Sequence, residues 1–180
     1  MSFTLIHQEH IDVNTEASSV KWIGSKITES HNGDIKIKSG KLILDHGRLA
    51  GGEFVIDMTT INTIDMSEKY NEKLNSHLIN EDFFNVDKYP TSQIIINNVE
   101  QFERTKYNIT ADLTIKGITN KISFIADVNI QGNSYLATAN LKIDRTKWDI
   151  KYKSGNYFKD LGNKAILDEI EFDIFLLSVK

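Results

Sequence analysis

Residues 107–143 read YNITADLTIKGITNKISFIADVNIQGNSYLATANLKI, and they carry the clearest structural pattern of the sequence. Apolar and polar residues alternate in it with a period of two, which is typical of a β-strand with one buried face. The alternation runs through three segments: 107–115, 122–130 and 135–143. Gly117 and the Gly132-Asn133 pair separate these segments, as turn residues do between antiparallel strands. The stretch therefore predicts three adjacent long strands in a meander.

Shorter apolar segments elsewhere predict further strands, for a total of about eight. They centre on Val20 to Ile23, Ile35 to Leu44, Phe54 to Met58, Ile94 to Ile96 and Ile170 to Leu176. An open sheet of this size would expose edges on which other chains can pair, whereas a closed sheet has no edges. The sequence therefore predicts an all-β fold, an eight-stranded antiparallel barrel.

One segment departs from the alternation. Between Asp65 and Asn80 the apolar residues recur at helical spacing, and Asp65 with Glu68 resembles a capping box. This pattern predicts one amphipathic helix between two strands, where it would cover one end of the barrel. Phe83 and Phe84 follow, and we expect them to anchor the helix and its loop to the barrel.

Composition and charge exclude several classes of protein. The chain has 180 residues, of which 40% are hydrophobic and 26% charged, as in an ordinary globular domain with a sizeable core. Without a repeat or a linker, it is expected to form a single domain over residues 1–180. The net charge of −4 is spread along the chain without blocks. Neither nucleic acid nor an acidic lipid surface is therefore an expected partner.

The absence of certain sequence features sets further expectations. There is no cysteine, and hence no disulfide and no thiolate metal site. No apolar run approaches the ~18 residues of a membrane-spanning helix. The first twenty residues, MSFTLIHQEHIDVNTEASSV, lack the apolar run of about 7–15 residues that an export signal needs. As written, the chain is expected to be cytoplasmic, or periplasmic if a signal has been removed.

The residues that face inward decide what the barrel holds. An eight-stranded barrel is either filled by side chains or just wide enough for one small ligand. Alanines among larger inward residues either leave an apolar channel or fit the taper of a packed barrel, and the sequence leaves both open. The predicted lining residues of a tunnel are Trp22, Phe54, Ile109, Ala111, Leu113, Phe124, Ala126, Tyr135, Ala137, Ala139 and Phe172. Because the best-defined inward faces carry no charge, a ligand is expected to be hydrophobic and elongated.

Three phrases of the sequence resemble the YceI-like family of small bacterial barrels. They are His77-Leu78 with DFFNVDKYP at 82–90, LTIKGIT at 113–119 and DRTKW at 144–148. The resemblance implies a lipocalin-like barrel with the helix at one end and a tunnel for a polyisoprenoid, isoprenoid quinone or fatty chain. Ala111 and Asp149 stand where the family often has glycine.

The residues that could carry catalysis lack the required arrangement. Glu169, Glu171 and Asp173 share the outward face of a strand, and Ser154 and Ser178 have no histidine and aspartate at a readable spacing. We therefore expect no catalytic residues, no cofactor and no enzyme activity.

Three basic side chains still require an explanation. A metal site in which His31 and His77 meet at the barrel mouth with Asp65 or Asp82 is a hypothesis; alternatively, His77 simply packs beside Leu78. We expect Arg145 to form an ion pair or to stack on an aromatic ring.

The main expectation is noncovalent carriage or sequestration of one elongated lipid-like chain. The first alternative is a packed, ligand-free barrel that acts as a stress-related interaction module through its outer surface. A second is a metal-assisted or isomerase-type enzyme working on a bound lipid. The partly apolar outer face around Phe175 and Leu177 also makes a homodimer an expectation.

Overall fold

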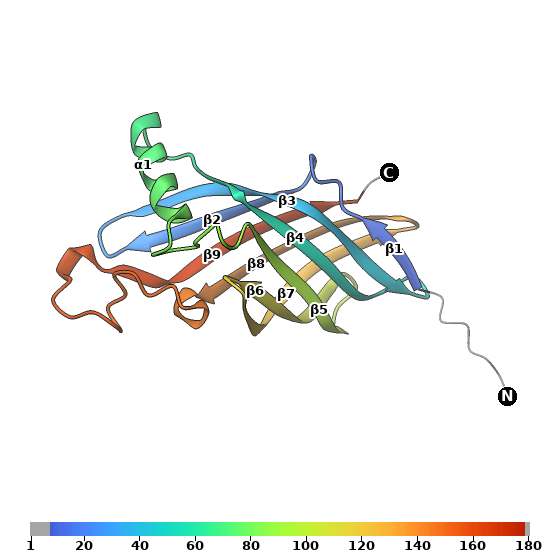
Figure 1. The fold of residues 1–180 in the computed structure, drawn as a ribbon. Coiled ribbons are helices and arrows are strands. Elements are labelled where there is room, and N and C mark those ends of the chain that lie inside the picture. Colours follow the sequence, from blue (N-terminus) through green and yellow to red (C-terminus); the bar gives the residue numbers. More distant parts are fainter. Residues whose placement is uncertain (1–7, 179–180) are drawn as a thin grey trace.

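The computed structural model describes residues 8–178, which form a closed antiparallel barrel of eight strands with one extra strand (Figure 1). In chain order the elements are β1 (Gln8–Asp12), β2 (Ser19–Lys26), β3 (Ser30–Asp45), β4 (Arg48–Thr63), α1 (Glu68–Ile79), β5 (Thr91–Gln101), β6 (Lys106–Ile115), β7 (Ile118–Gln131), β8 (Ser134–Asp144), η1 (Arg145–Trp148), η2 (Gly162–Lys164) and β9 (Ile166–Leu177). The ring runs β4-β3-β2-β9-β8-β7-β6-β5, and it closes because β5 also pairs with β4. The all-β, lipocalin-like barrel predicted from the sequence is confirmed.

The extra strand β1 continues the line of β2 along β3. β1 pairs with residues 41–45 of β3, whereas β2 pairs with residues 30–35. Between the two strands the chain turns, and the side chain of Asn14 accepts two backbone hydrogen bonds there. The alternation does not predict β1, because the turn interrupts the pattern.

Two glycines of β3 leave room for aromatic rings inside the barrel. Gly33 is the register partner of Trp22, and Gly40 is the register partner of Phe54. A Cβ atom at Gly40 would overlap the ring of Phe54, and one at Gly33 would lie 2.5 Å from Cζ2 of Trp22. The rings thus cover the glycines, an arrangement that supports a strongly bent strand.

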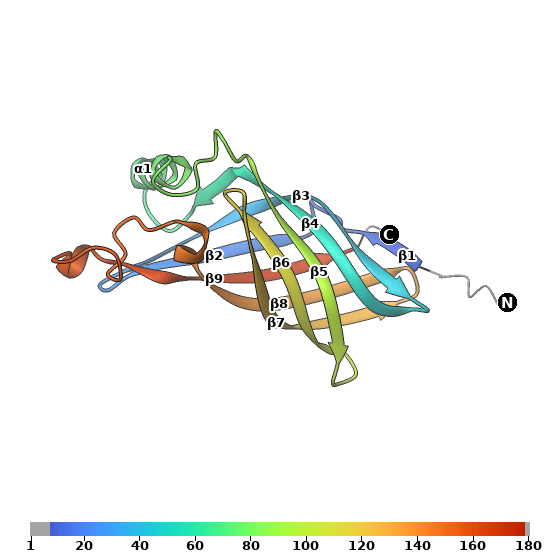
Figure 2. The same cartoon turned by 60° about the horizontal axis from the view of Figure 1, so that its bottom comes forward.

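The helix α1 lies over one end of the barrel, as Figures 1 and 2 show from two sides. Its buried residue is Leu78, whereas Tyr70 is exposed. The helix begins at Glu68 with Ser67 as its N-cap, so the predicted capping box of Asp65 and Glu68 is wrong, and the Asp65 carboxylate contacts His31. No helix in the described part of the chain is long and apolar enough to cross a membrane.

The glycine–aromatic contact predicts a specific sensitivity. Gly33→Ala should lower the free energy of unfolding by about 1–3 kcal/mol, because the added Cβ would overlap the Asn62 carbonyl oxygen and press on Trp22. Gly24→Ala is the matched control in β2, since a Cβ there would meet nothing within 4 Å. Urea denaturation of both variants is the measurement, and equal stabilities would contradict the packing described here.

Candidate ligand cavity

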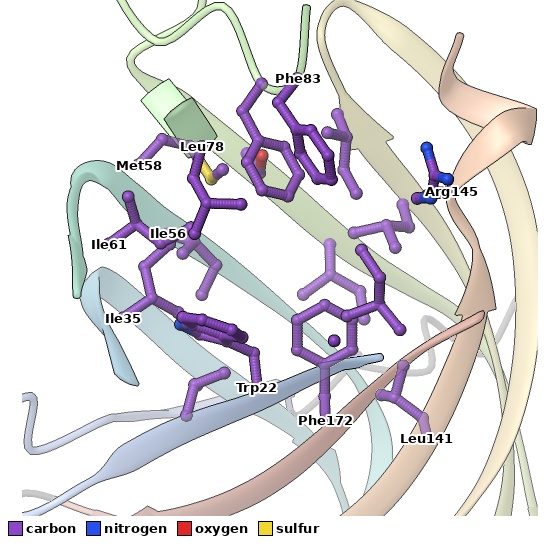
Figure 3. Close-up of a pocket in the computed structure, with 18 of the residues that line it drawn as sticks. Trp22, Ile35, Ile56, Met58, Ile61, Leu78, Phe83, Leu141, Arg145 and Phe172 are labelled. Atoms are coloured by element: carbon purple, nitrogen blue, oxygen red, sulfur yellow. The ribbon is translucent and has the colours of Figure 1, made fainter. Parts of the chain in front are cut away.

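Two adjoining apolar cavities occupy the interior of the barrel. The first, of about 150 Å³, lies at the end covered by α1, and Figure 3 shows most of its lining. The second, of about 80 Å³, lies farther along the barrel. Four residues border both cavities: Val20, Ile56, Ile94 and Ile174. The cavities are therefore consecutive parts of one apolar interior.

Most of the predicted lining residues border these cavities. Trp22, Leu113 and Phe172 border the first cavity. The second is bordered by Phe54, Ile109, Phe124, Ala126, Ala137 and Ala139.

Ala111 and Tyr135 are buried but border neither cavity. Ala111 lies between its cross-strand partners Ile96 and Ile122 and is fully buried. Tyr135 lies at the far end of the barrel, next to the turn between β7 and β8. Burial raises the pKa of the Tyr135 phenol well above its ordinary range.

Several inward side chains stay partly exposed although they point into the barrel. They are Ile56, Ile94, Leu113, Ile122, Phe124, Phe172 and Ile174. A close-packed interior would bury such side chains completely. Their exposure reflects the empty space beside them, so the structure favours the hollow barrel over the packed one.

The end of the first cavity nearest α1 comes partly from segments that the alternation does not identify. Phe83 and Phe84 follow the helix, are buried, and border the cavity with ring centroids 5.4 Å apart. Met58 borders it from β4 with the inward parity of Phe54 and Ile56, whereas Ile61 borders it beyond a register shift that changes this parity. Phe83 and Phe84 therefore line the cavity in addition to anchoring the helix.

Two polar side chains border the first cavity. Ser92 is 6% exposed, and its hydroxyl has no hydrogen-bond partner among the described residues. Arg145 is fully buried and donates to the carbonyl oxygens of Ile150 at 2.6 Å, Ile166 at 3.0 Å and Leu167 at 3.1 Å. The serine is thus unpartnered, whereas the arginine is held by the backbone.

Arg145 confirms the expectation of an ion pair and an aromatic contact. Its Nη2 lies 3.2 Å from the carboxylate of Asp168, and its guanidinium lies 5.5 Å from the ring centroid of Phe83. Burial lowers the pKa of Arg145 from its ordinary value, and the carboxylate of Asp168 opposes this shift. The neighbouring Asp144 instead accepts hydrogen bonds from Thr146.

His77 ties α1 to the segment that follows η1. Its ring centroid lies 4.5 Å from that of Tyr152 and 5.6 Å from that of Phe83. Its Nε2 is buried and has no partner among the described residues. Burial lowers the pKa of His77, and the nearby Asp82 carboxylate offsets this shift only in part.

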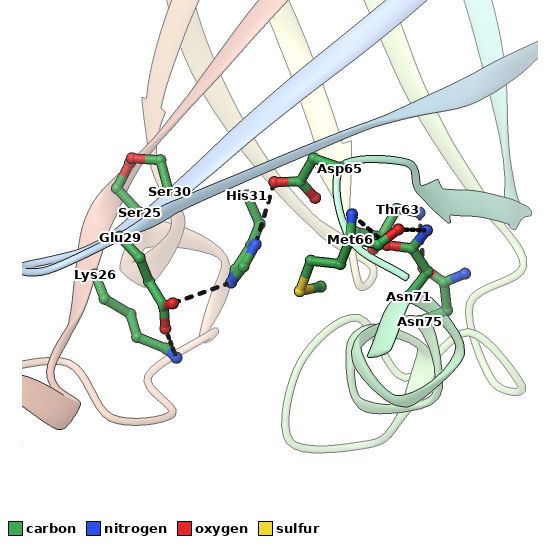
Figure 4. A network of polar contacts seen from close by, with 10 residues as sticks. All are labelled: Ser25, Lys26, Glu29, Ser30, His31, Thr63, Asp65, Met66, Asn71 and Asn75. Carbon is green, nitrogen blue, oxygen red and sulfur yellow. Dashed lines mark hydrogen bonds and ion pairs between the residues drawn. The ribbon is translucent and has the colours of Figure 1, made fainter. Parts of the chain in front are cut away.

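His31 lies in a polar network near the same end of the barrel (Figure 4). Its Nδ1 is 3.2 Å from the Asp65 carboxylate, and its Nε2 is 3.9 Å from Glu29, which pairs with Lys26 at 2.6 Å. The contact with Asp65 matches the hypothesis, but His77 has separate neighbours, so the predicted meeting of the two histidines is wrong. Within residues 8–178, no cluster of three or more potential ligands is placed to hold a metal ion.

The barrel wall is completed by η1 where β7 and β8 separate. Residues 118–125 of β7 and 140–144 of β8 are not paired with each other. Trp148 fills this region, is almost fully buried, and donates its indole N–H to the Leu113 carbonyl oxygen at 3.0 Å. Asp149 ends η1 with a φ of 59°, in the left-handed region that favours glycine.

The first cavity reaches the surface beside the start of β9. Leu167 borders the cavity and is nevertheless 46% exposed. Ile166 and Gly24 border it at the same place, and Ile166 is the register partner of Lys26 in β2. The pairing of β2 with β9 shifts register between Gly24 and Lys26, and we call this irregular part of the cavity wall, at Gly24, Ile166 and Leu167, the cavity mouth.

Comparison with known sequences gives one family. The model of the YceI-like domain matches residues 11–176. The UPF0312 protein plu2095 of Photorhabdus laumondii is 29% identical over 106 residues, which are 59% of this chain and 54% of that protein. Protein YceI of Escherichia coli is 30% identical over 103 residues, which are 57% of this chain and 52% of that protein. The chain spans about half the length of the curated relatives that it matches.

Comparison with solved structures shows the same fold. Burkholderia cenocepacia BcnA superposes with a TM-score of 0.75 at 21% identity, over 93% of this chain and 99% of that chain. A Saccharophagus degradans domain, described as a polyisoprenoid binding domain implicated in plant cell wall breakdown, superposes with a TM-score of 0.68 at 12% identity. That match covers 96% of this chain and 98% of the other.

The environment of His77 predicts a dependence of stability on pH. Its pKa is lower in the folded protein than the ordinary value of 6.5, so the unfolded chain binds more protons just below that pH. The contribution of His77 to the free energy of unfolding is fully present above about pH 6.5 and is lost as the pH falls toward the pKa of His77 in the folded protein. Between about pH 7.5 and 5.5, wild type should therefore lose more stability than His77→Phe.

Thermal unfolding across this pH range is the measurement. His10→Phe, at an exposed position of β1, is the control and should keep the wild-type pH profile. A His77→Phe profile that is parallel to wild type would contradict the role of burial at His77.

Proposed function

This chain belongs to the YceI-like domain family, and from that premise we propose that it binds one elongated lipid-like chain noncovalently inside its barrel. The observation that carries the proposal is the pair of adjoining apolar cavities, which together extend along the interior. Burial of apolar ligand surface would supply the affinity, at ~25 cal/mol per Å². The polyisoprenoid-binding description of the Saccharophagus degradans neighbour supports the same ligand chemistry.

The ligand class follows from the shape and polarity of the interior. An elongated cavity with an apolar wall fits a polyisoprenoid, an isoprenoid quinone or a fatty chain, and the hydrophobic contribution hardly distinguishes among them. The hydroxyl of Ser92, which has no hydrogen-bond partner among the described residues, favours a ligand that carries a polar group. A buried hydroxyl without a partner costs free energy, and a carbonyl or hydroxyl oxygen on the ligand would recover part of it. We therefore infer that the oxygen-bearing end of the chain lies in the first cavity.

The proposed role is carriage or sequestration. Ser92 borders the first cavity without a base beside it, and the guanidinium of Arg145 is held by three carbonyl oxygens and Asp168. These groups can orient a ligand, but they do not form the nucleophile and base pair that covalent catalysis requires.

A titration with a polyprenyl quinone tests the proposal. Quinones quench tryptophan fluorescence on contact, and Trp22 borders the first cavity. Protein freed of lipid should show saturable quenching with a long-chain quinone and much weaker quenching with the same quinone head lacking its chain. Equal quenching by both compounds, or none by either, would contradict binding of the chain.

Ala126→Leu should shorten the space available to the chain. The added carbons would fill the second cavity, which Ala126 borders, and leave the first cavity open. We expect the affinity for a long-chain quinone to fall about tenfold or more, with a smaller loss for a short-chain quinone. Ala50→Leu, on the exposed face of β4, is the control for added bulk. If Ala126→Leu left the affinity unchanged, the quinone chain would not lie in the second cavity.

Ser92→Ala tests the orientation of the ligand. Loss of one hydrogen bond should weaken the binding of a quinone or a fatty acid by about two- to tenfold, and leave a plain hydrocarbon chain unaffected. Ser123→Ala is the control, because Ser123 lies on the outer face of β7 near Thr110. Equal effects on polar and apolar ligands would contradict the inferred position of the oxygen.

A further inference from the structure

The segment that runs from the second half of η1 through η2 carries a concentration of positive charge. Residues 147–164 contain five lysines and two aspartates, a formal charge of +3 in a chain whose total is −4. The lysines are Lys147, Lys151, Lys153, Lys159 and Lys164. Only Lys151 pairs with a carboxylate among the described residues, that of Asp149 at 2.7 Å. We call residues 147–164 the basic loop; Figure 1 shows most of it in orange and red at the end of the barrel near α1.

The base of the basic loop is fixed to the barrel. Ser154 is fully buried, and its hydroxyl donates to the Asp168 carboxylate at 2.9 Å. The Asn156 side chain donates to the same carboxylate at 2.7 Å, while Arg145 pairs with Asp168 from the barrel side. The backbone N–H of Ile166 also donates to the Lys153 carbonyl oxygen at 2.9 Å. The loop is therefore held in a defined position.

The tip of the basic loop exposes large apolar side chains. Tyr157 is 52% exposed and Phe158 is 50% exposed, and both backbone N–H groups donate to the Ser154 carbonyl oxygen. Ile27, at the tip of the β2–β3 hairpin, is 63% exposed. Ile27 follows Lys26, which pairs with Ile166 of β9. The next residue of β9, Leu167, is exposed. Exposed apolar groups thus gather around the cavity mouth, next to the lysines.

This combination matches the requirements of an anionic lipid surface. Aromatic and aliphatic side chains enter the headgroup region, and each lysine near the surface strengthens the attraction. Acidic residues at the far end of the barrel matter little, because salt screens charges beyond roughly 8–10 Å while the 16-residue strand β4 extends for about 50 Å. We propose that the basic loop, with Ile27 and Leu167, docks on an anionic membrane surface and thereby brings the cavity mouth to the lipid. The role of the mouth rests on the proposed function, whereas the docking does not.

The distribution of acidic residues predicts the orientation of the docked protein. Residues 65–90, which include α1, contain six acidic residues and three lysines. This segment and the basic loop occupy different sides of the same end of the barrel (Figures 1 and 2). An anionic surface would attract the basic loop and repel the segment with α1, so the barrel would meet the membrane with α1 turned away.

Sedimentation with lipid vesicles tests the docking. Wild-type protein should bind phosphatidylcholine vesicles that contain phosphatidylglycerol, should bind pure phosphatidylcholine much more weakly, and should be released by salt. Lys159→Gln with Lys164→Gln should lower the partition coefficient by about tenfold or more. Phe158→Ser should lower it by about threefold or more.

Two control variants match these changes at other places. Lys36→Gln with Lys38→Gln removes two exposed lysines from the middle of β3, and Phe102→Ser removes an aromatic side chain that is 47% exposed in the β5–β6 turn. Both controls should bind anionic vesicles as wild type does. The proposal is overturned if the wild-type protein does not bind anionic vesicles, or if the control variants lose as much binding as the loop variants.

A quinone titration of the same variants without vesicles separates docking from ligand binding. The loop variants should bind quinone like wild type, because none of their substituted residues borders a cavity. Quinone binding without vesicle binding would overturn the docking alone. Vesicle binding without quinone binding would support the docking and contradict the proposed function.

Discussion

The barrel can close only because β3 bends enough to join both halves of its wall. β3 pairs with β1 and β2 on one side and with β4 on the other, so a strand of 16 residues must bend enough to join the two halves of the wall. Glycines at 33 and 40 permit this bend, and the rings of Trp22 and Phe54 cover them from inside. Closure removes the free edges of the barrel wall, but the inward side chains do not fill the space that it encloses.

The polar groups at the α1 end connect the hollow interior with the surface. Asp168 binds Arg145, which borders the first cavity, and also holds Ser154 and Asn156 at the base of the basic loop. A buried ion pair is costly unless hydrogen bonds complete it, and three carbonyl oxygens do so for the arginine. One carboxylate thus fixes both a part of the cavity wall and the position of the loop beside its mouth.

The sequence predicts the barrel well because alternation with a period of two follows directly from a sheet with one buried face. It predicts less at the α1 end, where a register shift in β4 changes the inward parity and Phe83 with Phe84 enter the cavity from a turn. The unpartnered state of Ser92 depends on its neighbours in three dimensions. The net charge of −4 also gives no indication of the basic loop. Its lysines form one positively charged surface because the loop is anchored at its base.

We propose that the hollow interior holds a lipid-like chain. Native mass spectrometry of the protein as purified from cells, followed by solvent extraction and mass analysis of what dissociates, is the direct test. We expect a stoichiometric adduct that disappears on extraction and yields a molecule with a long apolar chain. A mass equal to that of the polypeptide alone, unchanged after incubation with polyprenyl quinones and fatty acids, would contradict lipid binding.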